Sequence, residues 1–500
     1  MQTLRLSGRG LSPEALEIAA HGLCKVEISD EALARMAKAR VLVDRAVAEG
    51  TPVYGVTTGL GARATEVLDA GTLANFSRQT LEGRAQDMGA SLPPETVRAT
   101  LIVRLNTMLL GHSGARPEVA EFLAQVINAG LTPEVGSLGS IGAGDLVINA
   151  AMGRVLLGDG EMRGNGGVRP SRDALNDFGL TPLDPAPRDG LALANHSGYS
   201  AALAAITLAK ATRVYSATQA AAALSLEAFR ANLGPFEERV LAVKPLPGQD
   251  KAAAHLRELL KGSSLWQSGA ARRLQDPLSF RNIPQIHGGL ETALAHLRQV
   301  VEIELNGSSD NPITLAEDEE ILSCGGYHTT ELALAVEGVS RAWQHVAMGQ
   351  VARIARMMEP ELTGLPLFLT KPDSGSNGFA PLLKVVEALA AEITQAAQPV
   401  PVWPSINARG VEDALSAGSA TLNALSRGVE MAAKLSAIEL VIAAQGVDLR
   451  ETSQELGGPM RDWHARVRHH VAPLDADRPM GREIDTLSEA LHAFACAEAK

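Results

Sequence analysis

The first residue whose type and surroundings could support catalysis is a tyrosine in a glycine-rich loop. Tyr54 begins the run Tyr-Gly-Val-Thr-Thr-Gly-Leu-Gly, and glycines allow backbone conformations that bring such a loop close to a ligand. A phenol held there can act as a general base when a nearby cation stabilises its phenolate form. Taken alone, the segment is more typical of a structural tyrosine beside a turn.

A second glycine-rich run lies at residues 136–144 and holds four glycines and two serines. Its ordinary interpretation is a tight turn or an anion-binding nest, with Asp145 as the N-cap of a helix that continues to Leu157. No Lys-Ser/Thr pair follows the glycines, which excludes a phosphate-binding loop. No strand clearly precedes them, which argues against a dinucleotide fingerprint.

Three charged residues further along the chain are candidates for substrate contacts. Arg281, at the end of a polar loop that begins at Gln275, has a planar fork that can clamp a carboxylate, although a surface ion pair is equally typical. Lys384 lies in an apolar stretch, where a lysine usually extends its ammonium to solvent and otherwise needs an anionic or polarised partner. Glu412 is expected to open a helix after Pro404, an ordinary place for an acidic residue.

The composition restricts the class of protein. The 500 residues are 46% hydrophobic and 20% charged, which is typical of a globular protein with a large core. The formal net charge of -12 argues against a nucleic-acid partner. The three cysteines (Cys24, Cys324 and Cys496) are far apart, without zinc spacing, and fit a reducing compartment. We expect no metal and no cofactor.

The N-terminus has no apolar signal region, and no apolar run reaches about 18 residues, so we expect neither a signal peptide nor a membrane span. A cytoplasmic location is the expectation that follows.

The pattern along the chain predicts a mainly α fold in two parts. Residues 1–190 form a mixed N-terminal region, with helices beginning at Ser12 and Ser29, two helices between residues 94 and 128, and a Gly/Pro-rich loop at 164–188. Residues 191–500 form a bundle of long helices with a C-terminal cap. Helices are predicted over residues 197–230, 284–305, 329–358, 381–398 and 411–447. Such long apolar helices favour burial by association into an oligomer.

Taken together, these segments resemble the motifs of the histidine and aromatic ammonia-lyase superfamily, in the same order and at similar spacing. The Tyr54 loop resembles Tyr-Gly-x-Asn-Thr-Gly-Phe-Gly, and residues 190–195 resemble Gly-Leu-Ala-Leu-x-Asn. Residues 275–281 resemble Gln-Asp-Pro-Tyr-Ser-x-Arg. Further matches lie at residues 111–117, 308–312, 364–369 and 412–413. The resemblance covers residues from about 20 to 450.

The resemblance implies the long-helix fold of the ammonia-lyase/fumarase-like type and a homotetramer with composite active sites. It also implies anti elimination across the Cα–Cβ bond of an amino acid. In that reaction Tyr54 would take the β-proton, while Asn195 and Arg281 would hold the substrate carboxylate.

The sequence departs from the family where the family makes its electrophile. The family run Gly-Ser-x-Gly-Ala-Ser-Gly-Asp-Leu contains an Ala-Ser-Gly triad that cyclises to a methylidene-imidazolone. Here Ala143 is followed directly by Gly144, and aligning forwards from Pro133 gives a triad centred on Ile141, which has no hydroxyl to lose. The family's second tyrosine is Leu278, its early Ser-His pair falls at Gly83-Arg84, and Lys384 replaces an uncharged residue.

A lyase without this electrophile calls for a substrate with a good leaving group. The electrophile activates an amine, whereas a quaternary ammonium has no lone pair to attack it and leaves as neutral trimethylamine. The pattern therefore looks like the ergothionase branch, which converts ergothioneine to thiourocanate and trimethylamine.

Under this resemblance each remaining candidate has a role toward a small betaine or amino-acid substrate. Lys384 would donate to the thione sulfur, and Glu412 would accept from a ring N–H. Gln275 would lie near the carboxylate, and Tyr327 would face the trimethylammonium group.

Three alternatives stay open. One is a histidine or aromatic ammonia-lyase or aminomutase that makes its electrophile by another route. Another is a non-catalytic helical paralogue that binds a small ligand, although the joint presence of Tyr54, Asn195 and Arg281 favours an enzyme. The third is elimination from a different betaine, such as trimethylated histidine without sulfur.

Overall fold

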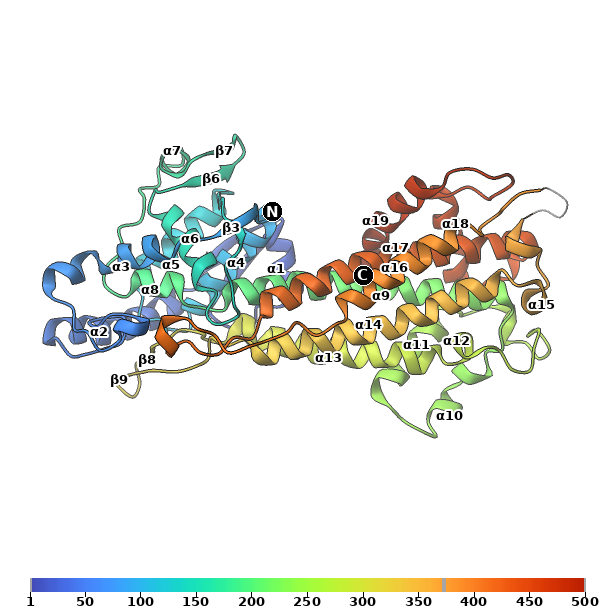
Figure 1. The fold of residues 1–500 in the computed structure, drawn as a ribbon, viewed down its shortest axis with the longest axis horizontal. Helices are drawn as coiled ribbons and strands as arrows, with labels where there is room; N and C mark the ends of the chain where they lie inside the picture. Colours follow the sequence, from blue (N-terminus) through green and yellow to red (C-terminus); the bar gives the residue numbers. More distant parts are fainter. Residues whose placement is uncertain (1, 371–374, 499–500) are drawn as a thin grey trace. The chain divides into compact units, whose positions relative to one another are not determined.

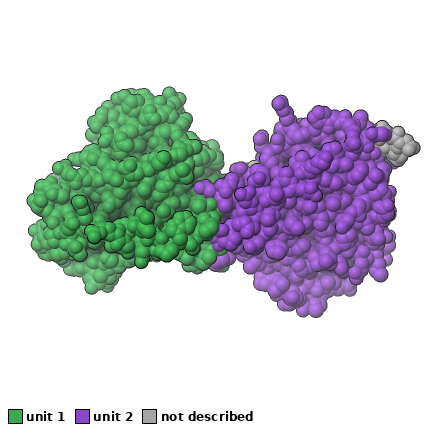
Figure 2. Space-filling model, viewed as in Figure 1, with its two compact units in different colours: residues 1–209, 298–334, 400–422 green, residues 210–297, 335–399, 423–500 purple. Residues whose placement is uncertain are grey.

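Long helices dominate the structure, a computed structural model that describes residues 2–370 and 375–498 (Figure 1). Contacts divide the chain into two compact units, coloured separately in Figure 2. Unit 1 contains residues 1–209, 298–334 and 400–422, and unit 2 contains residues 210–297, 335–399 and 423–500. The sequence predicted a single boundary between two parts of the chain, near residue 190. The chain instead re-enters unit 1 twice, because long helices begin in one unit and end in the other. These helices are α9 (Gly198–Phe229), α13 (Ile283–Asn306), α14 (Thr330–Met357) and α17 (Gly418–Arg450).

The first part of unit 1 alternates strands and helices. Strand β1 (Gln2–Leu6) pairs in parallel with β2 (Cys24–Ile28), and α1 (Pro13–Ala20) connects them. The predicted helix start at Ser12 is confirmed, because its Oγ accepts from the Ala15 N–H at 3.2 Å. The start at Ser29, before α2 (Asp30–Glu49), is confirmed by the same geometry. Strand β2 was not predicted, since the sequence favoured helical pieces throughout residues 12–48.

Several helices of unit 1 pack against one another and support the candidate site. Helix α3 packs against α6 and α8, and α4 packs against α5. The bounds are α3 (Ala70–Arg84), α4 (Pro94–Met108), α5 (Pro117–Asn128), α6 (Leu146–Leu156) and α8 (Asp189–Ala194). The predicted pair of helices between residues 94 and 128 is confirmed.

Short strands connect these helices. Strand β3 (Met88–Ser91) pairs antiparallel with β5 (Gly136–Leu138), which ties the end of α3 to the glycine-rich run. The remaining short elements are β4 (Thr132–Pro133), β6 (Glu161–Gly164), β7 (Gly167–Pro170), α7 (Ser171–Asn176), β8 (Ile313–Leu315) and β9 (Glu320–Leu322). The prediction of a continuous loop at 164–188 is thus wrong in part, because β7 pairs with β6 and α7 follows it.

Unit 2 is a helical bundle with a buried ion pair. Its shorter helices are α11 (Pro247–Leu259), α12 (Leu278–Arg281), α16 (Leu382–Ala396), α18 (Gly458–His470) and α19 (Gly481–Glu498). The buried Arg353 Nε lies 2.6 Å from Glu439 Oε1, and Arg353 Nη1 donates to the Ser279 carbonyl at 3.2 Å. This pair joins α14 to α17 and fixes α12, the short helix that ends at Arg281.

The long helices agree with the apolar pattern, and the mainly α fold is confirmed. The predicted helix over 411–447 is wrong at its start, because α17 begins at Gly418. The Ser416 and Ala417 N–H groups both donate to the Ile141 carbonyl, at 3.2 and 3.1 Å, and this holds the preceding segment in a non-helical conformation. Glu412 therefore does not open a helix. None of the described helices is both long enough and apolar enough to span a membrane.

Candidate active site

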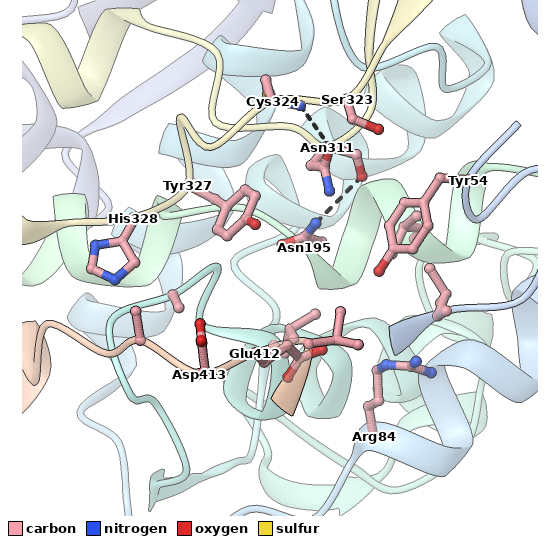
Figure 3. A pocket seen from close by; sticks show the side chains of 16 residues that line it. Tyr54, Arg84, Asn195, Asn311, Ser323, Cys324, Tyr327, His328, Glu412 and Asp413 are labelled. Atoms are coloured by element: carbon pink, nitrogen blue, oxygen red, sulfur yellow. Dashed lines mark hydrogen bonds between the residues drawn. The ribbon is translucent and has the colours of Figure 1, made fainter. Parts of the chain in front are cut away.

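A cavity of about 350 Å³ lies within unit 1 and gathers ionisable side chains from distant parts of the sequence (Figure 3). Its polar and ionisable lining includes Tyr54, Arg84, Asn195, Tyr327, Glu412 and Asp413. These residues come from the Tyr54 loop, the end of α3, the end of α8, the segment before α14 and the segment before α17. The cavity is therefore a place where tertiary structure, rather than local sequence, concentrates reactive groups.

The Tyr54 loop is held by its own threonines. Thr57 Oγ1 donates to the Thr51 carbonyl at 2.5 Å and accepts from the Val53 N–H at 2.8 Å. The phenol oxygen of Tyr54 accepts a hydrogen bond from the Gly61 N–H at 3.2 Å. A donor aimed at this oxygen stabilises negative charge on it. The ring is half-buried, and Figure 3 shows its hydroxyl directed into the cavity.

Two asparagines form the wall beside Tyr54. Asn195 Nδ2 donates to the Asn311 carbonyl at 3.4 Å, and Asn311 Oδ1 accepts from the Cys324 N–H at 3.0 Å. Both side chains are buried, at 7% and 9% exposure. Asn195 also packs directly on the glycine-rich loop, because a Cβ at Gly144 would lie 2.2 Å from its Oδ1.

The glycine-rich loop lines the cavity with Ala143 and uses its own backbone groups for structure. The Gly144 N–H donates to the Tyr327 carbonyl at 3.0 Å, and the Gly144 carbonyl accepts from the His196 N–H at 3.1 Å. The Gly142 carbonyl accepts from the Thr329 N–H at 3.1 Å. The loop therefore shapes the cavity without presenting the Gly144 N–H to a ligand.

Asp145 does not cap α6 as the sequence predicted. Its backbone is left-handed (φ 46°), and its buried carboxylate accepts from Ser140 Oγ at 2.5 Å and from the Ser200 N–H at 2.8 Å. Burial raises the pKa of Asp145, while these hydrogen bonds act in the opposite direction. The carboxylate joins the glycine-rich loop to α9 instead of capping the following helix.

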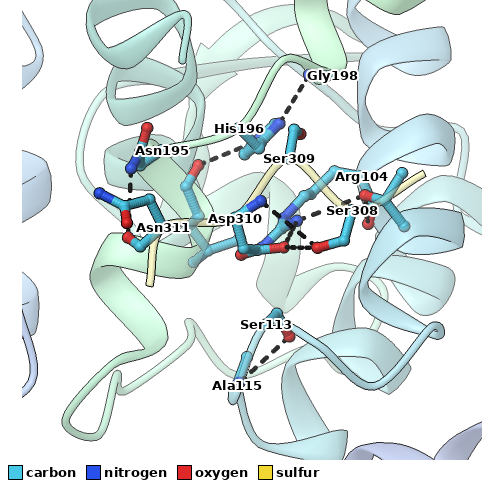
Figure 4. A network of polar contacts seen from close by, with 12 residues as sticks. Arg104, Ser113, Ala115, Asn195, His196, Gly198, Ser308, Ser309, Asp310 and Asn311 are labelled. Atoms are coloured by element: carbon cyan, nitrogen blue, oxygen red, sulfur yellow. Dashed lines mark hydrogen bonds and ion pairs between the residues drawn. The ribbon is translucent and has the colours of Figure 1, made fainter. Parts of the chain in front are cut away.

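A buried cluster behind the cavity fixes the chain at Asn311 (Figure 4). The Asp310 carboxylate forms a two-pronged ion pair with Arg104, with N–O distances of 2.7 and 3.0 Å. Arg188 Nη2 lies 3.4 Å from the same carboxylate, and its Nη1 donates to the Asn311 carbonyl at 3.2 Å. Burial by itself would raise the pKa of Asp310, but the charges of Arg104 and Arg188 outweigh it and the pKa is lowered.

The electrostatics of the cavity are mixed. Burial raises the pKa of the Tyr327 phenol, and the nearby Tyr54, Cys324 and Glu412 act in the same direction. Glu412 is held in an extended segment, where it pairs in an isolated bridge with Asn407. A cavity with two carboxylates and two phenols is suited to a substrate that carries positive charge.

The structure brings together some of the predicted site residues. Tyr54, Asn195, Tyr327 and Glu412 all line the cavity. The other three, Gln275, Arg281 and Lys384, belong to unit 2 and are not among its lining residues.

In unit 2, Arg281 Nη1 donates to Gln275 Oε1 at 2.8 Å, so these two predicted carboxylate-binding residues contact each other. The Nε of Arg281 is buried without a hydrogen-bond partner in the part of the chain that the structure describes. Lys384 is exposed on α16.

Several lining residues were not predicted as site residues, among them Arg84, Asn311, Ser323, Cys324, His328 and Asp413. The segment 308–312 was among the family-like motifs, and it could have indicated Asn311. Arg84 was noted only as a departure from the family, without a role.

Known proteins share the sequence pattern of this chain over most of its length. The family model described as aromatic amino acid lyase matches residues 11–469. The chain belongs to this family. It is 34% identical over 493 residues to a protein named histidine ammonia-lyase of Symbiobacterium thermophilum, covering 98% of this chain and 97% of the relative. The family is one of carbon–nitrogen lyases, and this chain is one of them.

Solved structures of the family give the same fold. The ergothionase of Treponema denticola, in complex with desmethyl-ergothioneine sulfonic acid, superposes with a TM-score of 0.94 at 29% identity and covers 99% of both chains. The histidine ammonia-lyase of Trypanosoma cruzi superposes with a TM-score of 0.91 at 28% identity, covering 100% of this chain and 94% of that one.

The buried carboxylate at Asp310 gives a prediction for stability and turnover. Asp310→Asn removes the partner of two buried guanidinium groups, and we expect it to lower the free energy of unfolding by about 3–5 kcal/mol. Turnover should also fall, because Asn311 loses its fixed backbone. Urea unfolding and steady-state rates measure the two effects. The control is Glu317→Gln, which breaks an exposed pair with Lys38 and should cost about 1 kcal/mol or less.

The effect of Asp310→Asn on the free energy of unfolding should depend on pH, because the pKa of Asp310 is lowered in the folded protein. A carboxyl whose folded-state pKa lies below its unfolded value of about 4 contributes full stability at neutral pH. That contribution is lost as the pH falls through the folded-state pKa. The gap in stability between the unaltered protein and Asp310→Asn should therefore be constant near pH 7 and shrink below about pH 4. A gap that grew on acidification would contradict this account of the cluster.

Proposed function

We propose that this lyase eliminates trimethylamine from ergothioneine to give thiourocanate, without an electrophilic prosthetic group. The observation that carries the proposal is the loop at Ala143-Gly144, which lines the cavity beside Tyr54 but has no hydroxyl-bearing residue between its alanine and glycine. The loop therefore has no serine at the position between alanine and glycine where the family's triad loses its hydroxyl. The site therefore suits a substrate whose amine needs no covalent activation.

Leaving-group chemistry connects the loop to the substrate. In the family's reaction the electrophile assists the departure of a primary amine, which is a poor leaving group. A trimethylammonium group already carries the positive charge and departs with the C–N electron pair as neutral trimethylamine. The remaining task is removal of the weakly acidic β-proton, which a base and stabilisation of the developing charge can achieve.

The residues of the cavity supply these functions. Tyr54 takes the β-proton, with its oxygen supported by the Gly61 N–H. As the C–H bond breaks, a Cα–Cβ double bond forms and the C–N bond cleaves. Glu412 accepts from a ring N–H of the substrate, and the face of Tyr327 lies against the trimethylammonium group.

The substrate carboxylate and the ring sulfur require further partners. Asn195 donates to the carboxylate from inside the cavity. We place Gln275 and Arg281 beside the carboxylate and Lys384 beside the sulfur, supplied by other copies of the chain in a homotetramer. Exposed apolar side chains support association, because Leu274 and Leu278 flank Gln275 at 89% and 58% exposure, and Ile406, near Glu412, is 93% exposed.

Ammonia elimination from histidine is the second candidate, and it rests on the relatives. A protein named histidine ammonia-lyase of Sorangium cellulosum is 36% identical over 502 residues, a higher identity than that of the ergothionase structure. Identity over the whole chain reports the shared scaffold, whereas the residues at 143–144 bear directly on the electrophile. For this reason we favour a betaine over histidine as the substrate. Aminomutase activity and a non-catalytic paralogue remain outcomes of the tests below.

The substrate assignment predicts a simple assay result. Incubation with ergothioneine should release trimethylamine and form thiourocanate, while histidine should give no urocanate. The mass of the intact protein should equal that of the sequence, because electrophile formation would remove two water molecules. A mass deficit of two waters together with histidine turnover would replace this proposal with the ammonia-lyase, and trimethylated histidine tests the other betaine.

The assignment of the base predicts a large rate effect at one phenol. Tyr54→Phe keeps the ring but removes the proton acceptor, and we expect kcat to fall by about 10²-fold or more with little change in stability. Tyr199→Phe is the matched control, since it removes a buried phenol outside the cavity and should retain the rate. A near-normal rate for Tyr54→Phe would remove Tyr54 from this role.

Shared sites predict complementation between two inactive variants. Tyr54→Phe alters the cavity in unit 1, and Arg281→Met alters a residue of unit 2. If one site takes these residues from different copies, hybrids formed by mixing equal amounts of both variants should regain about a quarter of the unaltered activity. No recovery in oligomers shown to exchange subunits would mean that both residues of a site come from one copy.

A further inference from the structure

Arg84 is a cation in the wall of the cavity, and it has no ion pair with the part of the chain that the structure describes. It is the last residue of α3, and Figure 3 shows its side chain among those that line the cavity, together with Tyr54 and Glu412. Its Nη1 donates a long hydrogen bond of 3.4 Å to the Thr80 carbonyl. Within residues 2–370 and 375–498, no carboxylate lies within 4.0 Å of its guanidinium nitrogens.

We propose that Arg84 is a positioning residue that favours the phenolate form of Tyr54 and thereby prepares the base for proton removal. This inference rests on the proposed role of Tyr54 as the base. Arg84 does not contact the reacting atoms in this account. It acts through the positive potential that it creates at the phenol oxygen.

The energetics of burial support a functional role for this cation. Taking a guanidinium partly out of water is costly unless a counter-charge compensates it. Arg78, six residues earlier on the same helix, shows the ordinary structural alternative, because its Nη1 lies 3.8 Å from the Glu82 carboxylate. The Arg84 guanidinium is partly removed from water and has no carboxylate at such a distance among the described residues. The cost of its burial must therefore be offset by groups across the cavity.

The groups that interact with Arg84 across the cavity are negatively charged when they are ionised. Burial lowers the pKa of the Arg84 guanidinium, and the negative forms of Tyr54 and Glu412 act against that lowering. Opposite charges attract each other, and Arg84 lines the same cavity as both of these groups. The Gly61 N–H adds a second positive influence at the Tyr54 oxygen, 3.2 Å away.

Other ionisable groups line the same cavity and could report on the same pH range. They are Cys324, Tyr327, His328 and Asp413. A rate profile alone therefore mixes several titrations, and a direct measurement on the phenol is needed.

Tyrosinate absorbance in the ligand-free protein provides that measurement. The chain has four tyrosines, and burial raises the pKa of Tyr199 to about 12 and raises the pKa of Tyr215 further. Burial also raises the pKa of Tyr327. The titration phase that belongs to Tyr54 is the one that disappears in Tyr54→Phe.

We expect Arg84→Met to move that phase upward by about one pH unit, a tenfold change in the ionisation equilibrium. Arg84→Lys should restore most of the original midpoint. Arg78→Met, which removes a positive charge from the same helix outside the cavity, should leave it in place. Arg84→Gln is a second charge-removing variant in case Arg84→Met does not fold. An unmoved phase in both charge-removing variants overturns the proposal.

Kinetics separate this role from direct substrate binding. With ergothioneine, Arg84→Met should lower kcat about tenfold on the acid side and approach the unaltered rate at high pH. KM should change little. A rise in KM at unchanged kcat and an unmoved titration phase would make Arg84 a substrate-binding residue instead. Because the absorbance titration needs no turnover, it tests Arg84 even when ergothioneine is not the substrate.

Discussion

The candidate site depends on one set of backbone hydrogen bonds made by the glycine-rich loop. The carbonyls of Ile141, Gly142 and Gly144 and the N–H of Gly144 bind three separate segments. His196 follows Asn195 at the end of α8, Thr329 follows the segment of Tyr327, and Ser416 follows that of Glu412. Each partner lies within four residues of a lining side chain. The loop thus joins the segments that supply the amide, the aromatic ring and the carboxylate.

Steric contact makes this arrangement specific. Gly142 has φ 76°, and a Cβ there would lie 2.0 Å from Ser416 Oγ, while a Cβ at Gly144 would meet Asn195 Oδ1. Ser416 Oγ also donates to the Gly142 carbonyl at 3.0 Å. An extra residue between Ala143 and Gly144 would have to displace one of these close contacts. The close packing of Gly142 on Ser416 and of Gly144 on Asn195 makes the loop a structural support for the cavity.

The sequence predicts the long helices well because their apolar pattern is local and extends over many turns. It fails where tertiary hydrogen bonds override local preference. Asp145 has the residue type of a helix cap, yet two serines take its carboxylate. Glu412 precedes an apolar stretch, yet the loop at Ile141 keeps its segment non-helical.

The candidate site shows the same division between local pattern and tertiary packing. Runs that resemble the family's motifs pointed to Tyr54, Asn195 and Glu412. Arg84 lies in no such run, and its place in the cavity wall follows from where α3 ends. Only the folded chain shows that this residue lines the same cavity as Tyr54 and Glu412.

The distribution of charge explains why the cavity of one chain suits only part of a zwitterion. Glu412 and Asp413, with the faces of Tyr54 and Tyr327, suit a cationic group, and Arg84 is an arginine of the same lining. Among the described lining residues, no second arginine or lysine is left to bind a carboxylate. Arg281, in unit 2, has a buried Nε without a partner, which is costly in isolation and is relieved when a carboxylate binds across its fork. The proposed function assigns both of these needs to one substrate that carries a positive and a negative charge.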